Sequence, residues 1–152
     1  MAKFRVLADV RVNLKGLDNL VSNSPSAIVN ALNEVTGAAL QIAKDRSRYD
    51  THDMQKGWRR SQIGFKSSIK ASNTSPGYRI YNNTLNKYGQ SYTQYHEFKI
   101  SRIDPQPMLA PAMQYVEQNL EKAIASNISD AADGSVFSAI SVGGPRSVEM
   151  ED

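Results

Sequence analysis

The first residues of the chain alternate between apolar and polar side chains. The apolar positions are Phe4, Val6, Ala8, Val10 and Val12, and the residues between them are mostly charged. A period of two places successive side chains on opposite faces of a strand. The pattern therefore predicts a β-strand over residues 4–12 with one face on a core.

A repeat with spacings of three and four residues follows. Ser24, Pro25 and Ser26 supply a capping hydroxyl and a proline that the first helical turn tolerates. The repeat itself consists of Ile28, Leu32, Val35, Ala39 and Ile42. This spacing forms one apolar stripe along a helix, which we expect to end near Arg46.

Two apolar segments flank a turn-forming sequence in the middle of the chain. Residues 58–69 form the first segment and residues 78–81 the second, and residues 72–77 between them are Ser, Asn, Thr, Pro and Gly. The apolar positions of the first segment are Trp58, Ile63, Phe65 and Ile69. We expect two strands joined as a hairpin.

Prolines introduce a second amphipathic helix near the end of the chain. Its stripe is Met113, Val116, Leu120, Ala123, Ile124 and Ile128, after Pro105, Pro107 and Pro111. We expect this helix to end near residue 131 or 132. Residues 133–152 have no periodic face, so we expect a C-terminal tail that is flexible or ordered only on assembly.

These elements predict an α+β fold. The sheet is small and mostly antiparallel, two amphipathic helices pack on one face, and the N- and C-terminal segments are extended. A length of 152 residues suits one core. We therefore expect a single domain over residues 1–132, followed by the tail over residues 133–152. The open edges of such a sheet favour pairing with another copy of the chain.

Composition narrows the class of protein. The absence of cysteine excludes disulfides, thiolate nucleophiles and thiolate metal sites. The longest apolar runs are far shorter than the ~20 residues of a membrane span, and residues 1–5 lack the pattern of a signal peptide. We expect a cytosolic product without membrane association. The net charge of +3 permits contact with nucleic acid but does not by itself indicate it.

Two clusters contain residue types used in catalysis. Asp50, His52 and Asp53 could bind a divalent cation or move a proton, but the same residues are typical of surface turns. His96 and Glu97 would point to opposite faces of an extended segment. We interpret Glu97 as a structural glutamate that accepts hydrogen bonds from a nearby loop or arginine. We predict no catalytic residue, no metal site and no cofactor.

Two further groups suit binding. A basic group surrounds Trp58 and could neutralise phosphates, although a solvated loop with Trp58 anchored in the core explains it as well. Its members are Arg46, Arg48, Lys56, Arg59 and Arg60. An aromatic and apolar group suits a protein interface. Its members are Tyr88, Tyr92, Tyr95, Glu97 and Phe98, with Val136, Phe137 and Ile140 of the tail.

Short motifs occur in a particular order between residues 26 and 130. They are Ala43-Lys44, Asp50-Thr51, Asp53-Met54, Trp58 to Ser61, Tyr81-Asn82-Asn83, Tyr88-Gly89, Tyr95-His96-Glu97-Phe98 and the proline phrase that runs from Arg102 to Ala112. In this order they resemble the neck or tail-completion family of long-tailed bacteriophages. His52 and Lys99 stand where that family usually has glycine. In the proline phrase, prolines fix an extended approach to the last helix while Met108 and Leu109 fill the core.

The resemblance implies a structural virion protein, assembled in the host cytoplasm, that forms a ring of six or twelve copies in the phage neck. The ring would contact the head-closure or connector protein and the tail terminator or tail tube protein, and DNA would pass through its lumen along the basic group. The N-terminal strand or the tail would cross to a neighbouring subunit. A small DNA-binding or packaging accessory protein and a metal-dependent hydrolase remain as other classes.

Overall fold

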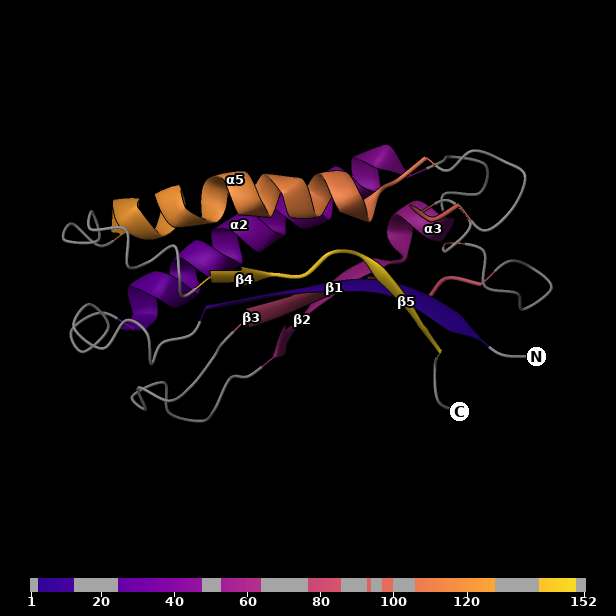
Figure 1. Ribbon diagram of the computed structural model, residues 1–152, viewed down its shortest axis with the longest axis horizontal. Helices are drawn as coiled ribbons and strands as arrows, with labels where there is room; N and C mark the ends of the chain where they lie inside the picture. Colours follow the sequence, from indigo (N-terminus) through magenta and orange to yellow (C-terminus); the bar gives the residue numbers. More distant parts are fainter. Residues whose placement is uncertain are drawn as a thin grey trace.

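Two long helices lie side by side on one face of an antiparallel sheet (Figure 1). The computed structural model describes residues 3–12, 25–47, 53–63, 77–85, 93, 97–99, 106–127 and 140–149. The elements are β1 (Phe4–Val12), α2 (Pro25–Arg46), α3 (Asp53–Lys56), β2 (Trp58–Ile63), β3 (Gly77–Asn82), α5 (Leu109–Asn127), β4 (Ile140–Val142) and β5 (Arg146–Glu149). The α+β fold predicted from the sequence is confirmed.

β1 is the central strand of the sheet. β3 pairs with one edge of β1, while β4 and β5 pair with its other edge, and β2 lies outside β3. The predicted hairpin is confirmed by the pairing of β2 with β3, in which Trp58 lies opposite Asn82 and Ile63 opposite Gly77. Gly77, assigned to the turn by sequence, starts β3. A Cβ there would lie 2.0 Å from the Val10 carbonyl oxygen.

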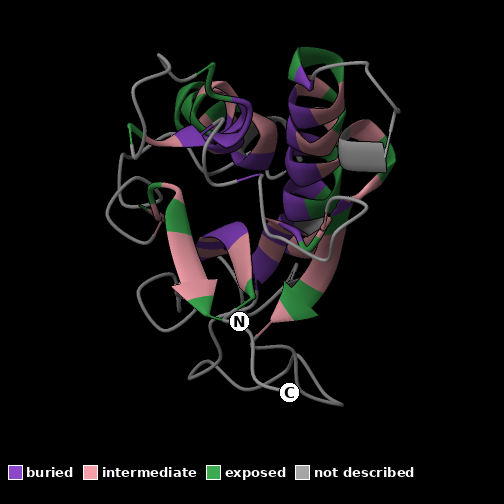
Figure 2. Ribbon diagram, turned by 90° about the vertical axis from the view of Figure 1, so that its right-hand side faces the viewer, coloured by how far each residue is buried: buried purple, intermediate pink, exposed green. Residues whose placement is uncertain are grey.

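The core lies between the helices and the sheet (Figure 2). β1 buries the even-numbered side chains from Val6 to Val12, as its alternation predicts. The predicted stripes of both helices face this layer: α2 buries Ile28, Leu32, Val35 and Ala39, and α5 buries Met113, Val116, Leu120 and Ile124. Burying one such large aliphatic side chain contributes roughly 1.5–3 kcal/mol. The expected end of α5 beyond Asn127 lies outside the described residues.

The C-terminal segment differs from its prediction. β4 and β5 pair antiparallel with β1, so the expectation of a flexible tail is wrong for residues 140–149. β1 is also paired on both edges within its own chain, which corrects the expectation that this strand crosses to a neighbouring subunit. The rest of the predicted tail, including Val136 and Phe137, lies outside the described residues.

A one-residue bulge joins β4 to β5. Residues 143–145 stand opposite only residues 8–9 of β1, because the register of β5 is shifted by one residue from that of β4. The N–H of Gly143 donates to the carbonyl oxygen of Asp9 at 2.8 Å. Glycine and proline are typical of bulges and sheet edges. The bulge lets one segment follow β1 along most of its length.

Candidate functional site

Glu97 and the proline phrase meet at the first turn of α5. The Glu97 carboxylate accepts hydrogen bonds from the backbone N–H groups of Met108 (3.0 Å), Leu109 (2.6 Å) and Ala110 (3.1 Å). The first N–H groups of a helix have no partner within it, and a negative charge there also interacts well with the helix dipole. The interpretation of Glu97 as a structural glutamate is confirmed. Because Glu97 is only 5% exposed and its oxygens are occupied, it no longer belongs to the candidate interface.

Trp58 is held beneath the helices by Ser47. The indole N–H donates to Ser47 Oγ at 2.7 Å, and Ser47 Oγ in turn donates to the Ala43 carbonyl at 2.8 Å. The sulfur of Met108 lies 3.3 Å from the same hydroxyl oxygen. Trp58 is fully buried, which confirms that it anchors the core.

These contacts join several motifs of the family resemblance into one unit, which we name the packed corner: Ser47, Trp58, Asn82, Glu97 and Met108. Trp58 of β2 lies opposite Asn82 of β3, and Asn82 Oδ1 accepts a hydrogen bond from the Thr84 N–H at 2.9 Å. Met108 connects the Glu97 cap to the Trp58–Ser47 pair. The corner fixes where α5 begins, and its polar groups are turned inward.

The basic residues selected from the sequence do not share one surface. Arg60 lies on the helix side of the sheet, where its Nη1 donates to the Asn33 carbonyl at 2.7 Å and to Thr36 Oγ1 at 2.8 Å. Its guanidinium also lies 4.8 Å from the centre of the Tyr78 ring. These contacts fasten β2 and β3 to α2, so Arg60 is a packing residue and no longer a candidate for DNA contact.

Arg59 and Arg46, two other members of the basic group, lie on different elements. Arg59 lies on the opposite face of β2 from Arg60 and donates to the carbonyls of Lys56 and Trp58. Arg46 is exposed at the end of α2, and Arg48 lies outside the described residues. Sequence proximity grouped these side chains, but the helix end and strand alternation separate them.

The sheet face turned away from the helices carries an arginine-rich surface that sequence reasoning missed. The strand register places Arg59, Tyr81, Leu7 and Arg146 in one row across four strands, and Ser61, Arg79 and Asp9 in the next. We name this surface the arginine face, defined by Arg5, Arg11, Arg59, Arg79 and Arg146. The alternation in β1 and β3 predicts part of the arginine face. The rest depends on the register between strands that are distant in the sequence.

Asp9 organises the charges of this face. Arg79 contacts it with two nitrogens, Nε at 2.8 Å and Nη2 at 3.1 Å, and Arg146 Nη2 lies 3.6 Å away. The side-chain hydrogen bond to Asp9 is the main cause that raises the pKa of Arg79 above its ordinary value. Five arginines and one aspartate give the described strand residues of this face four net positive charges. The whole chain carries only +3, so its positive charge is concentrated here.

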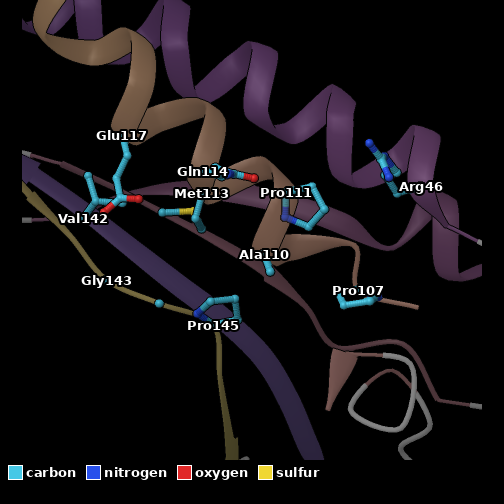
Figure 3. A pocket seen from close by; sticks show the side chains of 11 residues that line it. Arg46, Pro107, Ala110, Pro111, Met113, Gln114, Glu117, Val142, Gly143 and Pro145 are labelled. Atoms are coloured by element: carbon cyan, nitrogen blue, oxygen red, sulfur yellow. The ribbon is translucent and has the colours of Figure 1, made fainter. Parts of the chain in front are cut away.

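A groove runs between α5 and the β4–β5 segment, with a volume of about 510 Å³ (Figure 3). Its walls include Pro111 and Met113 of α5 and Val142 and Pro145 of the bulged segment, with Arg46 at one end. Ile140 and Phe98, two candidate interface residues, are half-buried and pack against the core. Tyr88, Tyr92 and Tyr95 lie outside the described residues.

Most of the residues that could serve in catalysis lie outside the described part of the chain. Within the described part, no group of three His, Asp or Glu side chains gathers to hold a metal ion. Asp50, His52 and His96 lie outside this part, and Asp53 begins α3. Neither long helix, over its described length, is apolar enough to cross a bilayer.

Comparison with family models, with curated protein sequences and with solved structures gave no match.

Proposed function

We propose that this protein is a structural subunit of the neck of a long-tailed bacteriophage. In this role it forms a ring that joins the head connector to the tail and lets DNA pass. The observation that carries the proposal is the packed corner. Sequence motifs that are individually weak evidence for the family resemblance meet there through hydrogen bonds at the start of α5. Such a corner fixes the relative position of helices and sheet, which a mechanical joint requires.

The edges of the sheet supply surfaces for ring formation. A closed ring requires two different complementary patches on each copy. In the described part of the chain, β2 pairs only with β3, so its other side presents backbone groups for pairing. β4 and β5 form the opposite edge of the sheet and are shorter. We propose that the β2 edge of one copy contacts the β4–β5 edge of the next.

Ring formation tests the proposal directly. The purified chain is measured by mass photometry over a range of concentrations, and by negative-stain microscopy alone and with phage tail tubes. We expect particles with the mass of six or twelve copies, or rings attached to tail ends. A chain that stays monomeric under all of these conditions would falsify the neck proposal.

The arginine face favours a second candidate, a small DNA-binding or packaging accessory protein. Such a protein would bind DNA without forming rings, and tail tubes would not change its mass. The same measurements with and without DNA therefore separate the two functions.

A further inference from the structure

The arginine face lies on the side of the sheet that neither long helix covers. α2 and α5 both lie on the other side of the sheet (Figure 1). All five cations of the face are arginines, although lysine and arginine are equally frequent in the chain. Arginine presents a planar fork of donors that matches the oxygen atoms of a phosphate. From this geometry we infer that the arginine face binds the phosphate backbone of double-stranded DNA.

The dimensions of the face suit a duplex. Arg59 and Arg146 stand in one row, separated by three strand spacings, which amounts to about 14 Å. A duplex carries one phosphate charge per ~1.7 Å of its axis, so a segment of that length carries about eight. Four net positive charges on the face can neutralise the phosphates on the side that approaches it.

Contacts within the sheet hold part of this surface in place before binding. Asp9 fixes Arg79 with two hydrogen bonds, through Nε and Nη2, and the Arg79 side chain is 26% exposed. The Arg5 guanidinium lies 5.7 Å from the centre of the Tyr81 ring, within the range of cation–π attraction. Side chains that are already positioned lose less conformational entropy when a ligand binds.

The composition of the face favours DNA over an acidic protein segment. Protein interfaces are centred on buried apolar or aromatic anchors. Here the central apolar side chain, Leu7, is only 1% exposed, so the middle of the face offers charge and hydrogen-bond donors. Contacts of this kind read phosphates and not bases, so binding should be independent of sequence. This inference deepens the proposed function, because the location of the arginine face at a ring lumen rests on that proposal. DNA binding by the face is itself a property of one chain.

Fluorescence anisotropy tests the inference. The probe is a labelled random-sequence duplex of about 30 base pairs, and the salt concentration is varied between about 50 and 200 mM. The face variant is Arg11→Gln/Arg59→Gln/Arg146→Gln, which leaves the Asp9–Arg79 pair intact. It should bind at least tenfold more weakly at low salt and reduce the slope of log K against log salt by about 2–3. The control variant, Lys44→Gln/Lys99→Gln/Lys122→Gln, removes the same charge from positions outside the face and should bind within twofold of the wild type.

Several outcomes would overturn the inference. These are no salt-dependent DNA binding by the wild type, an equal loss in the control variant, or tighter binding of a polyglutamate peptide than of DNA. If the face variant unfolds, the charge-preserving Arg11→Lys/Arg59→Lys/Arg146→Lys variant replaces it. That variant should keep most of the salt slope and bind more weakly. Mass photometry of the same samples keeps the proposals separate: rings without DNA binding contradict this inference alone, and DNA binding without rings contradicts the neck alone.

Discussion

Glu97 shows how a single side chain can set the start of a helix to which it does not belong. α5 has no acidic residue in its own first turn, so the carboxylate that caps it comes from a residue eleven positions before Met108. Glu97→Ala would leave three N–H groups without their acceptor in a largely buried place. We expect a loss of about 2–3 kcal/mol in the free energy of unfolding, measured by urea denaturation.

The control for this substitution is Glu117→Ala, an exposed acid on the same helix. Its effect should stay within about 0.5 kcal/mol. Glu97→Gln, which keeps one acceptor oxygen but loses the charge, should fall between the two. Equal stability of Glu97→Ala and wild type would mean that the cap does not determine the start of α5.

Sequence reasoning predicted the structural role of Glu97 but misplaced Arg60. A buried carboxylate needs hydrogen-bond donors around it wherever it lies in the fold, so the role of Glu97 follows from its residue type alone. Arg60 was grouped with Arg59 by proximity, whereas strand alternation sends the two guanidinium groups to opposite faces. The assignment of Arg60 required the position of α2 above the sheet, which no local pattern contains.

Elements with a long regular pattern and the β2–β3 hairpin were predicted from the sequence, and the shortest strands were not. β1, α2 and α5 each repeat an apolar spacing over nine residues or more. β4 and β5 have three and four residues, and Gly143, Gly144 and Pro145 between them resemble a loop. Their strand conformation depends on β1, more than a hundred residues away. That dependence is a tertiary effect, so local patterning did not reveal it.

A chain that ends at residue 139 tests whether the β4–β5 segment is part of the folded domain. The truncation removes Ile140 and Val142 from the edge of the core and exposes one side of β1. We expect the Tm to fall by about 5–10 °C, since roughly 2–3 kcal/mol of burial and pairing is lost. Differential scanning calorimetry measures this change. An unchanged Tm would restore the expectation of a flexible tail.

Across the whole molecule, the two layers divide the tasks that a ring subunit needs. The sheet has two different edges, so rotated copies can contact each other without closing as a dimer. The arginine face and the helix layer lie on opposite sides of these edges. In the proposed ring, contacts through the edges can therefore place the arginine face toward the lumen and the helices outward, toward the proposed head and tail partners.

A lysine on β2 tests this arrangement, because a charged lysine on an edge strand opposes pairing with another strand. The test variant is Gln62→Lys, at an exposed position of β2. The control is Gln41→Lys, the same substitution on the exposed side of α2. There a lysine can replace the hydrogen bond to Asp45 with an ion pair. We expect Gln62→Lys to raise the concentration needed for half-maximal ring formation about tenfold, equivalent to about 1.4 kcal/mol per contact. Its Tm as a monomer should fall only slightly, because the substitution removes just the long 3.5 Å hydrogen bond from Gln62 Nε2 to the Tyr78 hydroxyl. Gln41→Lys should assemble like the wild type. Rings of normal stability from Gln62→Lys would place the contact between subunits elsewhere than on the β2 edge, while weaker rings would link assembly to this edge strand, which pairs only with β3 in the described sheet.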